Sequence, residues 1–268
     1  NLQLSFNKLF SFAIAITPNY TYILYKTHHI IADGWAMTQF SEQVKEIYCK
    51  LKNNEDLSTF SRPSYLDVIK REDEYMNSAK YSTDYNFWKD YTAKINTDKL
   101  FQSDDIFDKT SKRSDYELPI NLSDKIEQFC NEKHITEYVF FLAVFSIYFS
   151  KIYNTNSFVF GTPFLNRQKK YGEMDCVGLF ISTLPLIVNI NKDEDFIELC
   201  KNISSNNFSI FKHSRFPYAH IEKLYHENSK DSSNLYEIGF SYQINELNYK
   251  MDDGSTGSFE WYFLGTQN

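Results

Sequence analysis

Two adjacent histidines, His28 and His29, are followed at short spacing by Asp33 and Gly34. Histidine is the one side chain whose ordinary pKa leaves it neutral, and therefore able to accept a proton, near pH 7. A neutral imidazole within hydrogen-bonding reach of an amine can take its proton or orient its lone pair for attack. A glycine at the start of a helix offers a backbone N–H to a developing oxyanion. These residue types suit transfer of an acyl group to an amine, although Gly34 fits equally well as a residue that only the turn requires.

The other residues of this group also have more than one interpretation. Adjacent side chains at the end of a strand point to opposite faces, so His28 is a hydrogen-bonded support residue if His29 faces a substrate. Zinc ligands must converge on one point, and for that reason we predict no metal site here. Asp33 is a candidate N-cap for the helix that follows and, less readily, an acid that orients His29.

The histidines fall where a strand ends and a helix begins. Apolar and polar residues alternate over 9–16 and 20–27, and the Thr17-Pro18-Asn19 turn between these runs predicts a hairpin. Apolar residues then recur at helical spacing over 35–51. A short turn held by a rigid scaffold is a common place for chemistry in an α/β fold.

Helical and strand patterns alternate along the rest of the chain. They predict helices over 64–75, 78–95, 124–133, 137–153, 196–211 and 218–226, and strands over 116–118, 158–161, 184–190, 236–244 and 258–264. Ser123 and Thr136 are predicted N-caps. The polar stretch 96–114 is the best candidate for a connection between lobes. This interleaving predicts an α/β fold with mixed sheets.

Bulk properties exclude several classes of partner. The net charge of −7 argues against nucleic acid, because phosphate binding needs clustered Lys and Arg. The longest apolar run, 138–149, is well short of the roughly 20 residues that a membrane-spanning helix needs. The four cysteines are scattered without a CxxC pair, and nothing resembles a signal peptide. We therefore expect a reduced, cytoplasmic protein that contacts neither nucleic acid nor membrane.

The stretch from His28 to Gly34 resembles the HHxxxDG motif of the condensation domains of nonribosomal peptide synthetases, which share a superfamily with chloramphenicol acetyltransferase. Further blocks resemble later motifs of this family, in the family's order and across nearly the whole chain: Pro63-Ser64-Tyr65-Leu66-Asp67, Asp84 with Phe87-Trp88, Gly161-Thr162-Pro163, Asn166-Arg167, Gly178-Leu179-Phe180, Phe216-Pro217 with 221–224, and Asn234-Leu235-Tyr236. The number and order of these blocks make the resemblance specific.

The resemblance implies a two-lobed chloramphenicol acetyltransferase-like fold with a tunnel between the lobes. Residues 1–105 would form part of the N-terminal lobe, with the HHxxxDG turn, and residues 106–268 most of the C-terminal lobe. Motifs that precede the HHxxxDG turn in the family are missing, so the N-terminal lobe is expected to be incomplete. The isolated fragment is therefore expected to be inactive and to expose its hairpin, 9–27.

The resemblance also implies a function. A condensation domain forms an amide bond between an acyl or peptidyl thioester donor and an aminoacyl acceptor, each bound to a carrier protein. His29 would be the catalytic histidine, with Gly34 beside it, and His28, Asp33 and Arg167 would support the site. Asp33 would form an ion pair with Arg167, which would set the geometry of the turn.

The same resemblance implies the partners. No cofactor would bind directly, because the phosphopantetheine arm is delivered on donor and acceptor peptidyl carrier proteins; an adenylation domain would be adjacent. Three alternatives stay open: a coenzyme A-dependent acyltransferase of the same superfamily, a non-catalytic docking module for carrier proteins, and an epimerisation domain. A docking module is expected to have a broken motif, whereas His28, His29, Asp33 and Gly34 are all present here.

Overall fold

The computed structural model of the chain describes residues 8–95, 113–228, 234–243, 248–250 and 256–258. The chain forms two compact units, and each is assembled from separated segments. The first comprises Asn1–Ser78, Leu165–Ser182 and Tyr249–Gly257; the second comprises Ala79–Phe164, Thr183–Asn248 and Ser258–Asn268. The sequence led us to expect one division after residue 105, a position outside the described ranges. The units differ from that expectation because a segment from the second half of the chain, Leu165–Ser182, is part of the first unit.

The first unit is built on the expected hairpin. Strands β1 (Phe10–Ile16) and β2 (Thr21–Thr27) pair antiparallel in a register that runs from Phe10↔Thr27 to Ile16↔Thr21. The Thr17 hydroxyl closes the turn, since it accepts a hydrogen bond from the Tyr20 N–H (3.0 Å) and donates one to the Tyr20 carbonyl (2.9 Å). The hairpin prediction is therefore confirmed.

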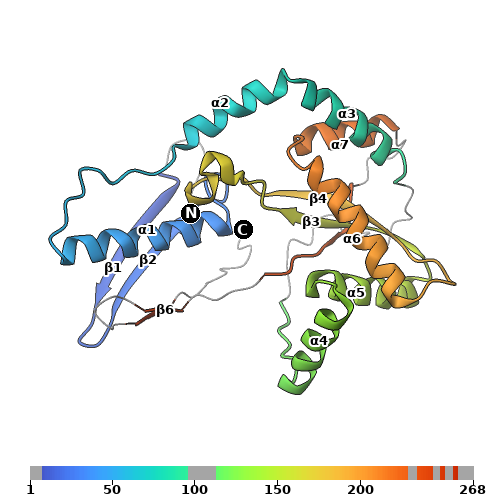
Figure 1. Cartoon of the computed structure of the whole chain (residues 1–268), viewed down its shortest axis with the longest axis horizontal. Coiled ribbons are helices and arrows are strands. Elements are labelled where there is room, and N and C mark those ends of the chain that lie inside the picture. Colours follow the sequence, from blue (N-terminus) through green and yellow to red (C-terminus); the bar gives the residue numbers. More distant parts are fainter. Residues whose placement is uncertain (1–7, 96–112, 229–233, 244–247, 251–255, 259–268) are drawn as a thin grey trace. The chain divides into compact units, whose positions relative to one another are not determined.

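Helix α1 (Gly34–Lys52) lies along this hairpin, as Figure 1 shows. Its Phe40 ring stacks on Phe12 of β1 and meets Tyr25 of β2 edge-on. The Tyr25 hydroxyl also hydrogen-bonds the Ser41 hydroxyl at 2.6 Å. The helix is thus packed against the strand that leads into His28. Helix α2 (Tyr65–Met76) follows, with Ser64 as its N-cap.

The second unit contains the remaining long helices and a three-stranded sheet. Its elements are α3 (Ala79–Thr92), α4 (Ile120–Lys133), α5 (Glu137–Tyr153), β3 (Ser157–Phe164), β4 (Ser182–Asn189), α6 (Phe196–Lys212), α7 (Tyr218–Asn228) and β5 (Ile238–Gly239). The strand order is β4-β3-β5, and β3 pairs parallel with β5. The short strands β6 (Asn248–Lys250) and β7 (Thr256–Ser258) pair with each other. Helices and strands interleave, and parallel pairing here accompanies the antiparallel hairpin of the first unit, so the prediction of an α/β fold with mixed sheets is confirmed.

The main hydrophobic core lies in the second unit. Its largest fully buried side chains include Trp88, Phe158, Phe160, Phe216, Leu142 and Leu184. Helix α5 contributes to it, as its long apolar run predicts, and Thr136 is its N-cap. Burial of each such side chain stabilises the fold by about 1.5–3 kcal/mol. At Gly161 the core is so tight that a Cβ atom would lie 2.3 Å from the Tyr236 ring.

Three sequence predictions are wrong or too generous in the described residues. The expected strand over 116–118 is extended chain without a strand partner. Helix α4 begins at Ile120, so Ser123 lies inside its first turn, where its N–H donates to the Pro119 carbonyl; Pro119 is the N-cap. The strand expected over 236–243 reduces to the two residues of β5. Position 244, residues 259–264 and most of the expected connection, 96–112, lie outside the described residues.

Among the described helices, none is by itself long and apolar enough to cross a membrane. Helices α4 and α5 pass the length and composition test only as a pair, and they are bent by 106° at the break between them.

Candidate active site

The His28 imidazole holds the motif turn together. The strand β2 ends at Thr27, and the His28 N–H still donates to the Leu9 carbonyl of the neighbouring chain segment, at 2.8 Å. The His28 carbonyl accepts from the Ile31 N–H (3.1 Å), and its Nδ1 atom accepts from the Ile30 N–H (3.1 Å). Because Nδ1 accepts, a neutral His28 carries its proton on Nε2. The half-buried ring therefore stabilises the turn on which its neighbour is presented.

His29 is exposed at the first position of this turn. Within the described part of the chain, no hydrogen bond to its imidazole is present. Both of its ring nitrogens are therefore open to solvent or to a ligand. The two histidines thus differ as neighbours at a strand end are expected to: one ring is bonded to the turn and the other is not.

The Asp33 carboxylate is buried, with 2 % of the residue exposed, and accepts four hydrogen bonds. Its Oδ1 atom accepts from the Ala36 N–H (2.8 Å), which makes Asp33 the N-cap of α1, and from Arg167 Nη2 (3.0 Å). Its Oδ2 atom accepts from the Phe180 N–H (2.9 Å) and the Ile181 N–H (3.2 Å). A carboxylate has about four lone-pair positions. No position is left to orient His29, whereas the N-cap and the ion pair are both present.

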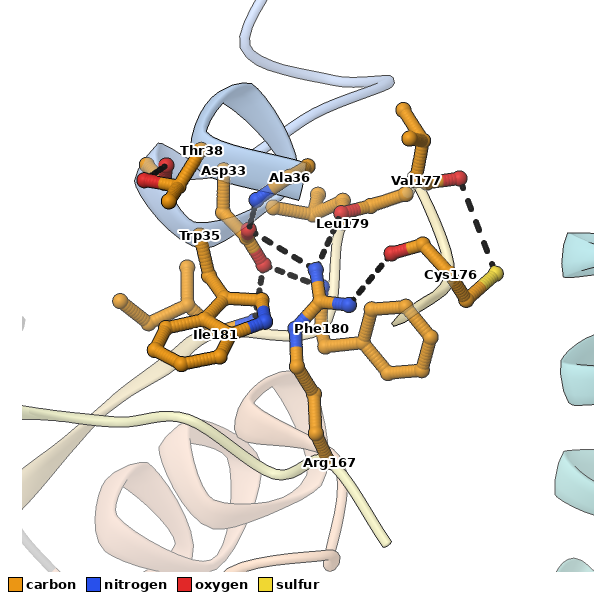
Figure 2. Close-up of polar contacts among 12 residues, drawn as sticks. Asp33, Trp35, Ala36, Thr38, Arg167, Cys176, Val177, Leu179, Phe180 and Ile181 are labelled. Atoms are coloured by element: carbon orange, nitrogen blue, oxygen red, sulfur yellow. Dashed lines mark hydrogen bonds and ion pairs between the residues drawn. The ribbon is translucent and has the colours of Figure 1, made fainter. Parts of the chain in front are cut away.

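Arg167 lies at the centre of the site, and its side chain is fully buried. Figure 2 shows its guanidinium between the Asp33 carboxylate and the carbonyl of Cys176. Nη1 donates to the Glu173 and Cys176 carbonyls at 2.8 and 2.6 Å, and Nη2 donates to Asp33 and the Gly178 carbonyl at 3.0 Å each. Its Nε atom has no partner in the described part of the chain. One arginine thus organises the whole loop that follows it.

We call residues Leu165–Ser182 the Arg167 segment. The start of α1 is fastened to it by the Trp35 indole N–H, which donates to the Met174 carbonyl at 2.8 Å, and by Gln43, which donates to the Asp175 carbonyl at 3.1 Å. From α2, the Tyr65 hydroxyl donates to the Leu179 carbonyl. A Cβ atom on Gly178 would lie 2.1 Å from the Tyr65 ring, so only glycine permits this approach.

Burial raises the pKa of the Tyr65 hydroxyl and of the Cys176 thiol. Both groups therefore stay protonated near neutral pH, and Cys176 is a poor nucleophile. Tyr65 and Gly178 belong to blocks that resemble family motifs, but their types and spacing alone predict no role for either. The signal available for Gly178 was a glycine beside a Leu-Phe pair, which is consistent with close approach of another group.

Gly34 is the exposed first residue of α1. It is absent from the glycines with a positive φ, so its backbone conformation is open to any residue. No described atom lies within 4 Å of the place where a Cβ would stand. The turn itself therefore has no need of a glycine, and the explanation based on close approach of another molecule gains weight over the conformational one.

The site has no metal-binding geometry in the part of the chain that the structure describes. No group of three or more His, Cys, Asp or Glu side chains is placed to hold a metal ion there. What the arrangement offers is an exposed imidazole and the N–H groups of a helix N-terminus, held by a buried ion pair. This suits proton transfer and stabilisation of a negative oxygen.

The sequence matches the Condensation domain family over residues 1–264, and the chain belongs to this family. It is 29 % identical over 261 residues, 96 % of this chain, to a protein of the plipastatin synthase of Bacillus subtilis (strain 168). It is 23 % identical over 241 residues, 88 % of this chain, to a protein of the surfactin synthase of the same strain. These alignments span only 10 % and 7 % of the two relatives.

Solved structures show the same fold. The first condensation domain of the calcium-dependent antibiotic synthetase, with a substrate analogue, superposes with a TM-score of 0.72 at 18 % identity, over 92 % of this chain and 55 % of that one. The starter condensation domain of rhizomide synthetase, with C8-CoA, gives 0.77 at 18 % identity, over 96 % and 57 %. The expected chloramphenicol acetyltransferase-like fold is confirmed. The chain spans slightly more than half the length of these solved chains.

Proposed function

We propose that this chain carries the catalytic turn of a condensation domain that forms an amide bond between two carrier-bound substrates. The donor is an acyl or peptidyl thioester, and the acceptor is the amine of an aminoacyl thioester. The observation that supports this most directly is the buried Asp33–Arg167 pair (3.0 Å), which sets the start of α1 beside an exposed His29. This geometry presents one unengaged imidazole on a rigid support.

In the proposed reaction the acceptor nitrogen attacks the thioester carbonyl carbon, and the C–S bond to the donor arm breaks. His29 accepts a hydrogen bond from the amine, takes its proton as the C–N bond forms and returns a proton to the leaving sulfur. No bond forms between protein and substrate, and the net products are an amide and a thiol. Gly34 contributes its N–H to the negative carbonyl oxygen, where the N-terminus of α1 adds favourable electrostatics. His28, Asp33 and Arg167 act as supports that hold the turn.

The partners in this proposal are a donor and an acceptor peptidyl carrier protein, with an adenylation domain adjacent in the polypeptide. No cofactor binds the chain directly, because the carrier proteins bring the phosphopantetheine arms. Membership of the Condensation domain family supports these partners. A reduced, cytoplasmic setting is supported by four free cysteines at separate positions, three of them buried.

The decisive experiment is His29→Ala in the complete condensation domain. With both carrier proteins loaded, we expect amide formation to fall at least about a hundredfold, the lower range for a general base. We expect the melting temperature to stay unchanged, because His29 is exposed and makes no hydrogen bond to a described residue. His226→Ala, an exposed histidine in α7, is the control and should leave the rate unchanged. Normal turnover with a normal melting temperature would show that His29 has no catalytic role.

The same assay distinguishes the alternatives. The fold does not, because the epimerization domain from tyrocidine synthetase B superposes with a TM-score of 0.69 at 17 % identity. Transfer from an acyl-coenzyme A without a donor carrier would favour a coenzyme A-dependent acyltransferase. Inversion of a carrier-bound aminoacyl group without amide formation would favour epimerisation. Binding of loaded carriers without either reaction would favour a docking module.

A further inference from the structure

A second buried ion pair stands behind the first one. Glu173, in the Arg167 segment, has a side chain that is 3 % exposed, and its Oε1 atom accepts from Nε and Nη2 of Arg71 in α2, at 3.2 and 2.9 Å. Its Oε2 atom accepts from the Gln168 N–H at 2.7 Å. Neither Arg71 nor Glu173 belongs to a motif that the sequence alone makes visible.

Glu173 joins the two ion pairs through a single residue. Its side chain binds Arg71, and its backbone carbonyl accepts from Arg167 Nη1 at 2.8 Å. Its carboxylate also holds the N–H of the residue next to Arg167. Arg167 in turn binds Asp33, the N-cap of the helix that follows the His29 turn. A continuous set of contacts therefore runs from α2 to the proposed catalytic turn.

Charge makes each link depend on the next. The cluster holds two buried carboxylates and two guanidinium groups, and each carboxylate has its own arginine. A buried carboxylate that loses its cation is strongly disfavoured and seeks another donor. If Arg71 were replaced by a neutral residue, Glu173 would compete with Asp33 for Arg167, because the Glu173 backbone already lies against that guanidinium. Such a change would displace Asp33 and the turn that it caps.

We propose that Arg71 and Glu173 are positioning residues for condensation, which hold Arg167, and through it Asp33, in the geometry that places His29. This inference rests on the proposed function. Neither residue touches the substrate in this proposal. Their removal should therefore lower the rate of the chemical step in molecules that are fully folded.

The test is a single-turnover measurement on the complete condensation domain, in excess over loaded donor and acceptor carriers. The amplitude reports the competent fraction of molecules, and the rate constant reports the geometry within that fraction. For Arg71→Met we expect the rate constant to fall about ten- to hundredfold, since a displacement near 1 Å at a reacting group costs up to that much. Arg71→Lys keeps the charge but not the two-pronged contact, so its rate constant should lie between those of Arg71→Met and the wild type.

The matched control is Arg62→Met. Arg62 pairs with Glu46 in the same unit, but this pair is solvent-exposed and has no contact with Arg167 among the described residues. Its rate constant should stay within about twofold of the wild type, because an exposed ion pair contributes little. A folded Arg71→Met, or a folded Arg71→Lys where Arg71→Met does not fold, with the wild-type rate constant overturns the proposal. Should the wild-type domain itself form no amide, the proposed function fails instead, so the two failures are distinguishable.

Discussion

At the scale of single residues, the site separates the groups that the structure itself needs from those that it does not. Asp33 and Arg167 have structural partners at nearly every polar atom. His29 and Gly34 are exposed, and the described fold gives neither a reason for its residue type. Groups that the fold does not explain are the ones best explained by a ligand.

This contrast leads to a prediction for Gly34→Ala. The added Cβ meets open space and the backbone needs no positive φ, so the fold should tolerate the change. Alanine is the better helix former, by up to about 1 kcal/mol in a helix interior, and the melting temperature should stay equal or rise slightly. If substrate must approach the N–H of Gly34 closely, the condensation rate should nevertheless fall at least about tenfold, or about 1.4 kcal/mol.

Calorimetry and the single-turnover assay together check this prediction. Glycine at 239 is a suitable control, because a Cβ there also meets open space and the residue lies in β5, away from the motif turn in sequence. Gly239→Ala should leave the rate unchanged. A fully active Gly34→Ala would restore the view that this glycine has no catalytic part.

At the scale of elements, the Asp33–Arg167 contact joins the start of α1 to a segment that lies 134 positions later in the chain. Replacing either residue by Ala leaves a buried charge unpaired, which costs on the order of 3–5 kcal/mol of stability. Asp33→Ala should be the more damaging, because it also removes the N-cap of α1 and leaves the N–H groups of Phe180 and Ile181 without their acceptor. We expect both variants to lose stability and activity together.

A double-mutant cycle in urea measures this link. The double variant should be less destabilised than the sum of the two single variants, by a coupling energy of about 1–3 kcal/mol. The Lys70–Asp67 pair on the exposed face of α2 is the control, because an ion pair of that kind contributes only about 0–1 kcal/mol. Strict additivity for Asp33 and Arg167 would mean that the two residues do not stabilise each other.

The elements also show where sequence reasoning succeeds. Amphipathic periodicity located the hairpin, α1, α2, α5, α6 and α7 to within a few residues, because burial of one face imposes that spacing. It failed where pairing decides the outcome: residues 116–118 are extended, but a strand needs a neighbour to bond, and Tyr116 is 90 % exposed. It also placed the start of α4 too late, since Ser123 is a favourable N-cap type whereas the actual cap, Pro119, has no side-chain oxygen to reveal it.

The same distinction holds for the site. The two histidines, Asp33 and Gly34 were visible because they are close in sequence, and Arg167 was found only through a family resemblance. Arg71 and Glu173 carried no local signal, since one is an ordinary charged residue of a helix and the other of a polar loop. Their contact depends on how the Arg167 segment folds against α2 within the first unit. Long-range contacts of this kind are not encoded in any short window of sequence.

At the scale of the whole molecule, the hairpin is the most exposed apolar feature among the described residues. Ile14, Ile16, Tyr22 and Leu24 are all exposed. One face is partly covered, because Phe12 and Tyr25 pack on Phe40 of α1. Alternate residues of a strand point to opposite faces, so Tyr22 and Leu24 share a face other than that of Tyr25, and each strand has only one strand partner among the described residues. A two-stranded ribbon with an open apolar face and open edges is a surface that other chains can join.

We therefore expect this chain on its own to self-associate as its concentration rises through the micromolar range. Leu24→Glu places a charge on the open face and should shift sedimentation toward the monomer. Leu66→Glu is the control, since Leu66 on α2 is similarly exposed (67 % against 62 %) but lies outside the hairpin. Sedimentation velocity at several concentrations distinguishes the cases. A strictly monomeric wild-type chain, or equal effects of both substitutions, would show that the exposed hairpin does not drive association, and that the open face is tolerated in water as it stands.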